Sequence, residues 1–110
     1  MAEGYRSIIW FRTKPGMGPE FEAAFIEAGM LARPRAVDGY LGAELLRSVA
    51  EHDEYYVIGR WASPTAYADW QAIASRDAPR EALVRMSNAL ADHRAGQLLS
   101  PCTPLLPSGG

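Results

Sequence analysis

The sequence EYYVIGRWASPTAYADW, residues 54–70, contains the strand and the helix that decide the fold. Its first part, 54–62, is rich in aromatic and β-branched residues, which is typical of a β-strand. Ser63 and Pro64 then predict a helix start, because a serine hydroxyl can accept a bond from a free backbone amide and proline suits the first helical position. We therefore expect a strand that is followed directly by a helix over 64–74.

The residues before this stretch predict a strand, a helix and a hairpin partner. Residues 5–13 are again aromatic and β-branched, and both faces of this strand carry bulky side chains. Apolar residues then recur at helical spacing from 18 to about 33, where Pro34 disfavours helical geometry in the residue before it. Residues 40–49 form another strand, which we expect to pair with 54–62 as an antiparallel hairpin.

The residues after this stretch predict another helix and a last strand. The helix runs from about 79 to 93, with Met86 on its apolar side. Residues 97–107 contain three prolines, so they can form only an edge or terminal strand. We expect a single domain over 1–107 and a flexible tail over 108–110.

The order strand, helix, strand, strand, helix with a second helical segment, strand matches the split βαβ arrangement of a ferredoxin-like α+β fold with an antiparallel sheet. In this arrangement the helices cover one face of the sheet. The other face carries aromatic and aliphatic side chains and needs a partner to cover it. We therefore expect a homodimer in which two such faces pair about a two-fold axis.

The composition of the chain excludes several classes of protein. The 110 residues carry a formal net charge of -2 without any run of lysine or arginine, which argues against nucleic-acid binding. No apolar stretch is long enough for a membrane span, and residues 1–6 show no basic region followed by a long apolar stretch, so we expect neither a membrane span nor a secretory leader. Cys102 is the single cysteine, so an internal disulfide cannot form. These features predict a protein of the reducing cytoplasm that binds neither nucleic acid nor a membrane.

The two histidines do not predict a metal site. His52 and His93 are far apart in the sequence and the acidic residues are scattered, so no metal-ligand spacing is present. His52 lies in a polar hairpin loop, which is typical of a solvated surface residue. His93 lies near the end of the last predicted helix, where an imidazole can stabilise the helix terminus. If His93 faces a cavity instead, it is the base for deprotonating a phenol or an activated carbon.

Three motifs resemble those of a known family: KPGMGPEF at 14–21, DGYLG at 38–42 and RWASPTAYADW at 60–70. With them, the chain resembles the antibiotic biosynthesis monooxygenase domains of the dimeric α+β barrel superfamily over about residues 5–100. The resemblance implies a homodimeric α+β barrel with a cavity between the sheet and the helices of each subunit. It also implies a chemistry, because some members oxidise anthrones, a class of polycyclic aromatic polyketides, to quinones with O2 and without flavin, metal or haem.

The resemblance also assigns site residues. Trp61 matches the tryptophan that ends the third strand in the anthrone-oxidising members, and Tyr67 matches a tyrosine one helical turn later in some of them. Val57 stands where those members have an asparagine, four positions before the tryptophan, so an amide expected to hold a substrate oxygen is missing. With His93 as the candidate base, the predicted catalytic residues are Trp61, Tyr67 and His93. The predicted substrate-binding residues are Trp10, Tyr40, Tyr56, Val57, Trp70 and Met86.

Relatives that degrade haem offer a second comparison. They use an asparagine on the first strand, a tryptophan on the helix after the third strand and a histidine that ligates iron. Those positions here hold Ile9, Trp70 and Pro79 or Arg80. Only the tryptophan is kept, which disfavours haem degradation. The aromatic residues also have a purely structural interpretation, since large aromatic side chains usually fill a protein core.

From the resemblance we expect a cofactor-independent monooxygenase that oxidises an aromatic polyketide of the anthrone or quinol type to a quinone. O2 is the co-substrate, and the setting is antibiotic or other specialised-metabolite biosynthesis. Two alternatives remain open. One is a polyketide cyclase or isomerase on the same scaffold, which would use the same base without O2. The other is a ligand-binding or dimerisation module without turnover.

Overall fold

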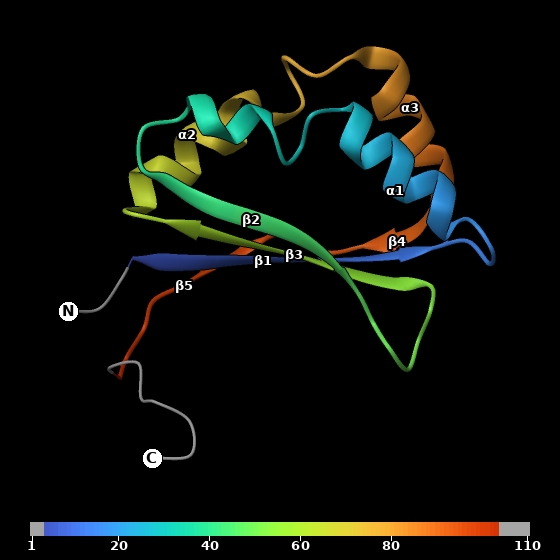
Figure 1. Cartoon of the computed structure of the whole chain (residues 1–110), viewed down its shortest axis with the longest axis horizontal. Helices are drawn as coiled ribbons and strands as arrows, with labels where there is room; N and C mark the ends of the chain where they lie inside the picture. Colours follow the sequence, from blue (N-terminus) through green and yellow to red (C-terminus); the bar gives the residue numbers. More distant parts are fainter. Residues whose placement is uncertain (1–3, 104–110) are drawn as a thin grey trace.

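The computed structural model of the chain describes residues 4–103 (Figure 1). Five strands make up one sheet, namely β1 (Tyr5–Thr13), β2 (Tyr40–Arg47), β3 (Glu54–Trp61), β4 (Leu90–His93) and β5 (Gln97–Leu99). Three α-helices and one 3-10 turn complete the described elements, namely α1 (Gly18–Glu27), the turn η1 (Arg33–Ala36), α2 (Pro64–Ala74) and α3 (Arg80–Ala89).

The sheet is antiparallel throughout and has the strand order β2-β3-β1-β4. β4 and β5 pair with successive parts of β1, on the side of β1 that is opposite to β3. The helices lie together on one face of the sheet, and the other face carries none (Figure 1). This arrangement confirms the predicted ferredoxin-like α+β fold with an antiparallel sheet.

Strand β1 makes clear how the two faces of the sheet differ. Ile9 and Phe11 point to the helices, where the Phe11 ring lies 5.2 Å from the ring of Phe21 on α1. Trp10 lies between them in the sequence and therefore points to the opposite face. The register pairs Trp10 with Tyr56 of β3, so both aromatic rings share that face. We call the two sides of the sheet the helix face and the open face.

Two clusters of buried side chains fill the space between the helices and the sheet. The first, called the phenylalanine cluster, joins α1 and α3 to the middle of the sheet, and its members other than alanine are Phe21, Phe25, Tyr55, Val57 and Met86. The second, called the tryptophan cluster, joins α2 to the end of β3 and consists of Trp61, Ala66, Tyr67 and Trp70. Burial of this apolar surface is the main favourable contribution to folding.

Helix α1 is shorter than the sequence predicts. It ends at Glu27 and not near residue 33, because Gly29 has a φ of +74°, in the left-handed region that glycine adopts without strain. The backbone amide of Met30 then bonds back to the carbonyl of Phe25. Apolar residues continue at helical spacing past the end of α1 because Leu31, although outside the helix, still packs against the phenylalanine cluster.

The predicted end of the helix over 79–93 is also wrong. α3 stops at Ala89, and the next residue, Leu90, has an extended backbone that pairs with Thr13 of β1. Pairing with the sheet has overridden the local helical spacing. His93 therefore lies on strand β4 and not at a helix terminus.

Two predicted strands, over 40–49 and 97–107, are longer than the strands observed. β2 ends at Arg47 and not at residue 49, and the strand predicted over 97–107 is seen as β5, over Gln97–Leu99. Residues 104–110 lie outside the described residues, and so do the predicted domain end at 107 and the predicted tail at 108–110. Within the part that is described, no helix has both the length and the apolar character needed to cross a membrane.

Candidate functional site

The tryptophan cluster and Tyr40, which packs against it, bring together four of the predicted site residues. Trp61 ends β3 with 2% of its surface exposed, and its ring lies 5.5 Å from the ring of Tyr67 on α2. The ring of Tyr40, at the start of β2, lies 5.3 Å from Trp61 on another side. Trp70 is buried on the same helix as Tyr67, about one turn further on. Together these side chains form one packed aromatic wall.

The indole N–H of Trp61 is used inside the protein. Its Nε1 donates to Oγ of Ser7 on β1 at 2.9 Å, and both residues are buried. Gly59 makes this contact possible, because a Cβ at that position would lie 2.5 Å from Ser7 Oγ and 2.7 Å from Trp61 Nε1. A buried ring with a partnered N–H makes Trp61 a fixed wall that has no donor to offer a ligand.

The hydroxyl of Tyr67 is buried, and no hydrogen-bond partner for it exists among residues 4–103. Burial raises the pKa of Tyr67, so the hydroxyl stays protonated at neutral pH and remains a donor. A Cβ at Gly96 would lie 2.3 Å from this hydroxyl, so the connection from β4 to β5 passes directly over it. A buried donor in this state costs free energy until a water or a ligand oxygen accepts its proton.

Arg33 of η1 contacts the tryptophan cluster at Trp70. The guanidinium carbon lies 5.1 Å from the centre of the Trp70 ring, in a cation–π contact. The same side chain donates to the backbone carbonyls of Ala28 at 2.9 Å, of Ile73 at 3.3 Å and of Ala74. The sequence does not reveal this role of Arg33, because these carbonyls belong to the ends of two helices that are distant in the sequence.

A cavity of about 560 Å³ lies between α3 and β4, and we call it the α3–β4 cavity. Its volume is within the usual range for small-molecule sites. Phe11 and His93 are directly paired in the register of β1 and β4, so the phenyl ring and the imidazole lie side by side in the lining. Apolar side chains of the lining include Leu83, Met86 and Leu90, and its polar side chains include Ser75, Ser87 and Asp92.

His93 therefore lies at a cavity, which is one of the two environments that the sequence left open for it. The neighbouring carboxylate of Asp92 is occupied, since it forms an ion pair with Arg12 at 3.6 Å and accepts the backbone amide of His93 at 2.8 Å. With Asp92 engaged in these contacts, the His93 imidazole is the candidate base of this lining.

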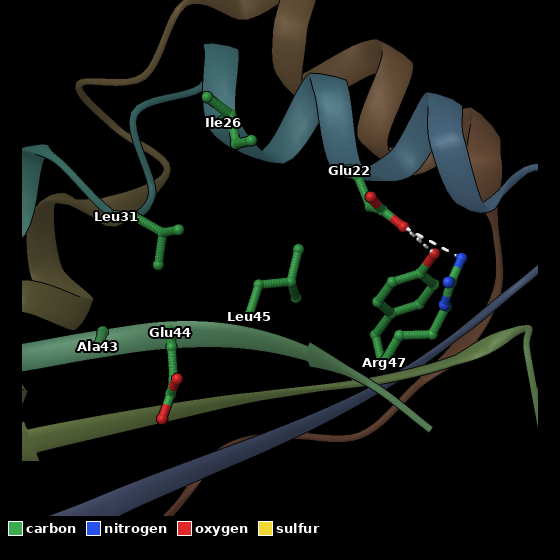
Figure 2. A pocket seen from close by; sticks show the side chains of 8 residues that line it. Glu22, Ile26, Leu31, Ala43, Glu44, Leu45 and Arg47 are labelled. Carbon is green, nitrogen blue, oxygen red and sulfur yellow. Dashed lines mark hydrogen bonds and ion pairs between the residues drawn. The ribbon is translucent and has the colours of Figure 1, made fainter. Parts of the chain in front are cut away.

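A second cavity, of about 420 Å³, lies between α1 and the edge strand β2, and we call it the α1–β2 cavity. Figure 2 shows Ile26 on α1, Leu31 in the loop after α1 and Leu45 on β2 directed into it. These three side chains give the cavity apolar walls. None of the residues in its lining is among those predicted from the sequence to form the site.

The polar end of the α1–β2 cavity consists of Glu22, Tyr55 and Arg47. The Tyr55 hydroxyl donates to Oε2 of Glu22 at 2.5 Å, and the Arg47 guanidinium lies 3.8 Å from the same oxygen. Burial, together with the bond to the Glu22 carboxylate, raises the pKa of Tyr55 to about 12. A sequence signal for this site does exist. The period of two along β2 places Arg47 on the helix face after Leu45, and a charged residue at such a position needs a partner.

Trp10 and Tyr56 lie on the open face and are not brought together with Trp61. The indole Nε1 of Trp10 donates to Oε1 of Glu54 at 3.2 Å. Two guanidinium groups lie over its ring, that of Arg94 at 4.7 Å and that of Arg12 at 5.5 Å from the ring centre. Trp10 thus belongs to a charged cluster on the side of the sheet away from the helices.

Metal-ligating side chains are dispersed in the described part of the chain. Within residues 4–103, no three His, Cys, Asp or Glu side chains gather in a way that could hold a metal ion. His52 is exposed in the hairpin loop between β2 and β3, and Cys102 is exposed after β5.

Two solved structures resemble this architecture over most of their length. SnoaB from Streptomyces nogalater, described as a cofactor-independent oxygenase, is 20% identical with a TM-score of 0.69, and the match covers 94% of this chain and 98% of that one. A conserved protein from Methanosarcina mazei is 14% identical with a TM-score of 0.69, over 90% and 93% of the two chains. At such identities the likeness concerns the fold.

A curated relative and a family model match parts of the sequence. A heme oxygenase (mycobilin-producing) from Mycobacterium tuberculosis is 38% identical over 58 residues, which are 50% of this chain and 50% of that protein. The chain thus spans about half the length of this relative. The model of the family described as antibiotic biosynthesis monooxygenase matches residues 4–78, which are more than half of the chain. With the motifs and the fold in agreement, the chain belongs to the antibiotic biosynthesis monooxygenase family.

Proposed function

We propose that the chain is a cofactor-independent monooxygenase that oxidises an aromatic polyketide of the anthrone or quinol type to a quinone, in antibiotic or other specialised metabolism. The observation that carries this proposal is the α3–β4 cavity, in whose lining the His93 imidazole lies beside the Phe11 ring and the Met86 side chain. An apolar and aromatic lining with one base suits a planar, weakly acidic substrate.

The chemistry of such a substrate needs little from the protein. His93 takes a proton from the activated CH2 group or the hydroxyl of the substrate. The resulting electron-rich anion transfers electrons to O2, and a C–O bond forms at the carbon that carries the negative charge. For an anthrone, the CH2 group loses both hydrogens and gains one oxygen atom, and the second oxygen atom leaves as water. O2 is the oxidant and the substrate is the reductant, so the reaction balances without a further redox cofactor.

The tryptophan cluster is the second part of the proposed site. We assign Trp61, Trp70 and Tyr40 the role of aromatic walls, and Tyr67 the role of donor to a substrate oxygen. The buried Tyr67 hydroxyl, which lacks a partner in the described part of the chain, supports this role. The proposed donor compensates for the amide that is missing at Val57.

The heme oxygenase relative raises haem degradation as an alternative. The residues present do not fit a haem iron at the position that haem-degrading relatives use for their histidine. Pro79 precedes α3 as its N-cap and Arg80 is the first residue of α3, and neither side chain is an axial ligand of haem iron. We therefore propose no step that uses haem.

The proposal includes a cytoplasmic homodimer that is formed through the open faces of two sheets. Strand alternation gives this face the apolar side chains Ile8, Trp10, Leu46, Tyr56, Ile58 and Leu99. Leu46 is 41% exposed and Leu99 is 45% exposed, so a single chain leaves large apolar side chains in water. Trp10 and Tyr56 suit this pairing better than contact with a substrate on the helix face.

The test of the proposed reaction is turnover of a panel of anthrones and quinols, with and without O2. We expect quinone formation in air and none under anaerobic conditions. His93→Gln removes the base and keeps a polar side chain, so it should lower kcat by a factor of about 10²–10⁴. His52→Gln, at the exposed histidine of the hairpin loop, is the matched control and should leave kcat unchanged.

Each other outcome has a distinct meaning. Equal product with and without O2 would support a cyclase or isomerase and overturn the monooxygenase. If the protein binds compounds of the panel but forms no product with or without O2, it is a ligand-binding module without turnover. An unchanged kcat in His93→Gln would remove His93 from the mechanism.

A further inference from the structure

We propose that the α1–β2 cavity is a second ligand site, which binds a small organic acid through its carboxylate group and its apolar body. This proposal does not depend on the reaction proposed above, because the linings of the two cavities share no residue. One cavity lies at the β2 edge of the sheet and the other at the β4 edge, with β3 and β1 between them. Binding at the β2 edge can therefore be measured separately.

The walls of the cavity suit an apolar body. Ile26 is 62% exposed, which is high for an aliphatic side chain that faces other apolar groups. Leu31 and Leu45 face it across the gap between α1 and β2 (Figure 2). The volume of about 420 Å³ is sufficient for a molecule of one or two rings, and filling it would remove this apolar surface from water.

The polar end of the cavity offers a cation. Glu22 is already satisfied at Oε2, which accepts the Tyr55 hydroxyl at 2.5 Å and lies 3.8 Å from the Arg47 guanidinium. The raised pKa of Tyr55 keeps its proton in place for this bond. Arg47 has five N–H donors and its side chain is 53% exposed, so donors remain available after its contacts with Glu22 and Tyr55.

This arrangement selects an acid over an amine. Besides Glu22, Glu44 is the other carboxylate of the lining, and Figure 2 shows it directed from β2 to the side opposite Leu45. Glu22 is engaged through Oε2, and the Arg47 guanidinium is the more exposed of the two charged groups, 53% against 40%, so it is the charge that a ligand meets first. The planar fork of N–H groups on arginine matches the two oxygens of a carboxylate, whereas an ammonium group would be repelled.

The experiment compares three probes of the same shape and different charge: naphthoate, naphthamide and naphthylmethylamine. Titration calorimetry on the full chain should give the tightest binding for naphthoate. Arg47→Met keeps the length of the side chain and removes its charge, so it should weaken naphthoate at least tenfold and leave naphthamide within about twofold. Arg12→Met is the matched control, because Arg12 is also a half-exposed arginine in an ion pair but lies on β1 next to β4, away from this cavity.

A second measurement does not depend on any variant being folded. In the wild type, naphthoate should shift the methyl resonances of Ile26, Leu31 and Leu45, and it should leave those of Leu83 and Leu90 in the other cavity in place. Tighter binding of the amine, equal binding of naphthoate and naphthamide, or shifts confined to the α3–β4 cavity would each overturn the proposal. Failure of the O2 assay above would leave it intact.

Discussion

Trp61, the most buried tryptophan of the chain, depends on two small residues of the sheet. Ser7 supplies the acceptor for its indole N–H, and Gly59 leaves the space in which the two groups meet. The aromatic residue itself could be chosen from the sequence, because it ends a strand and precedes a helix cap. Its partner could not, because Ser7 lies 54 positions away and no local pattern connects the two. Long-range polar pairs of this kind become visible only in the folded chain.

The first prediction concerns this buried bond. Ser7→Ala leaves the Trp61 N–H without an acceptor in a buried site, so the free energy of unfolding should fall by about 1–3 kcal/mol. Urea unfolding followed by tryptophan fluorescence measures the change. Ser100→Ala, at an exposed serine, is the control and should stay within about 0.5 kcal/mol of the wild type. If the two variants are equally stable, the hydrogen bond makes no net contribution to the free energy of unfolding.

The second prediction concerns Tyr55, whose pKa rises from 10.0 to about 12 in the folded chain. Because the folded state holds this proton more tightly than the unfolded state, the resulting stability is complete below pH 10 and is lost as the pH rises toward about 12. The Tyr55→Phe variant should lack this part of the loss of stability at alkaline pH. Urea midpoints at pH 9 and above pH 11, compared between wild type and variant, measure it. Parallel loss in both proteins would contradict the assignment.

At the scale of elements, helix starts and helix ends differ in how far sequence predicts them. The start of α2 is local, because the Ser63 hydroxyl accepts the Ala66 amide at 3.1 Å as its sequence position predicts. The apolar spacing does not mark the ends. α1 ends at Glu27, two residues before the left-handed Gly29, while the apolar spacing continues, and α3 gives way to β4 because Leu90 pairs with Thr13 on β1. Tertiary pairing determines the end of α3, and it places His93 in a cavity lining and not at a helix terminus.

The third prediction tests how the helix ends are held. Arg33 donates to the carbonyl of Ala28 just after α1 and to those of Ile73 and Ala74 in the last turn of α2. Arg33→Met should therefore lower the free energy of unfolding by roughly 2 kcal/mol, since charged hydrogen bonds to backbone acceptors are lost. Thermal or urea unfolding measures the change.

The control for Arg33 lies two residues further along the same 3-10 turn. Arg35 is exposed and donates to the single carbonyl of Ala32 at 3.1 Å. Arg35→Met should change stability by less than about 0.5 kcal/mol. If both variants lose the same amount, the loss belongs to the turn in general and not to the contacts of Arg33.

For the molecule as a whole, the alternation of side chains along the strands determines which surfaces remain for partners. The helix face is filled by the two clusters and bears both cavities, whereas the open face keeps aromatic and aliphatic side chains at the surface. This division could be predicted from the sequence, because both faces of the first strand carry large apolar side chains. For the α1–β2 cavity the sequence signals only the charged residue Arg47 on the helix face, and the cavity itself could not be predicted, because it depends on how far α1 stands from the edge strand.

The fourth prediction concerns the proposed dimer. Ile58 lies at the middle of the open face, opposite Ile8 of β1. Ile58→Glu places a charge in the proposed interface and should convert the dimer to a monomer in sedimentation or light scattering. Val49→Glu, at a residue 92% exposed in the hairpin loop, should remain dimeric. A wild-type chain that is monomeric at high micromolar concentration would contradict the proposed pairing.

The same alternation gives the protein a set of built-in optical reporters. Of its three tryptophans, Trp10 lies partly exposed on the open face with two guanidinium groups over its ring, while Trp61 and Trp70 are buried in the tryptophan cluster. A variant that keeps only Trp10 would register association through its emission, and one that keeps only Trp61 would register loss of the core. The assembly and the unfolding of one chain could then be followed as two separate signals in a single titration.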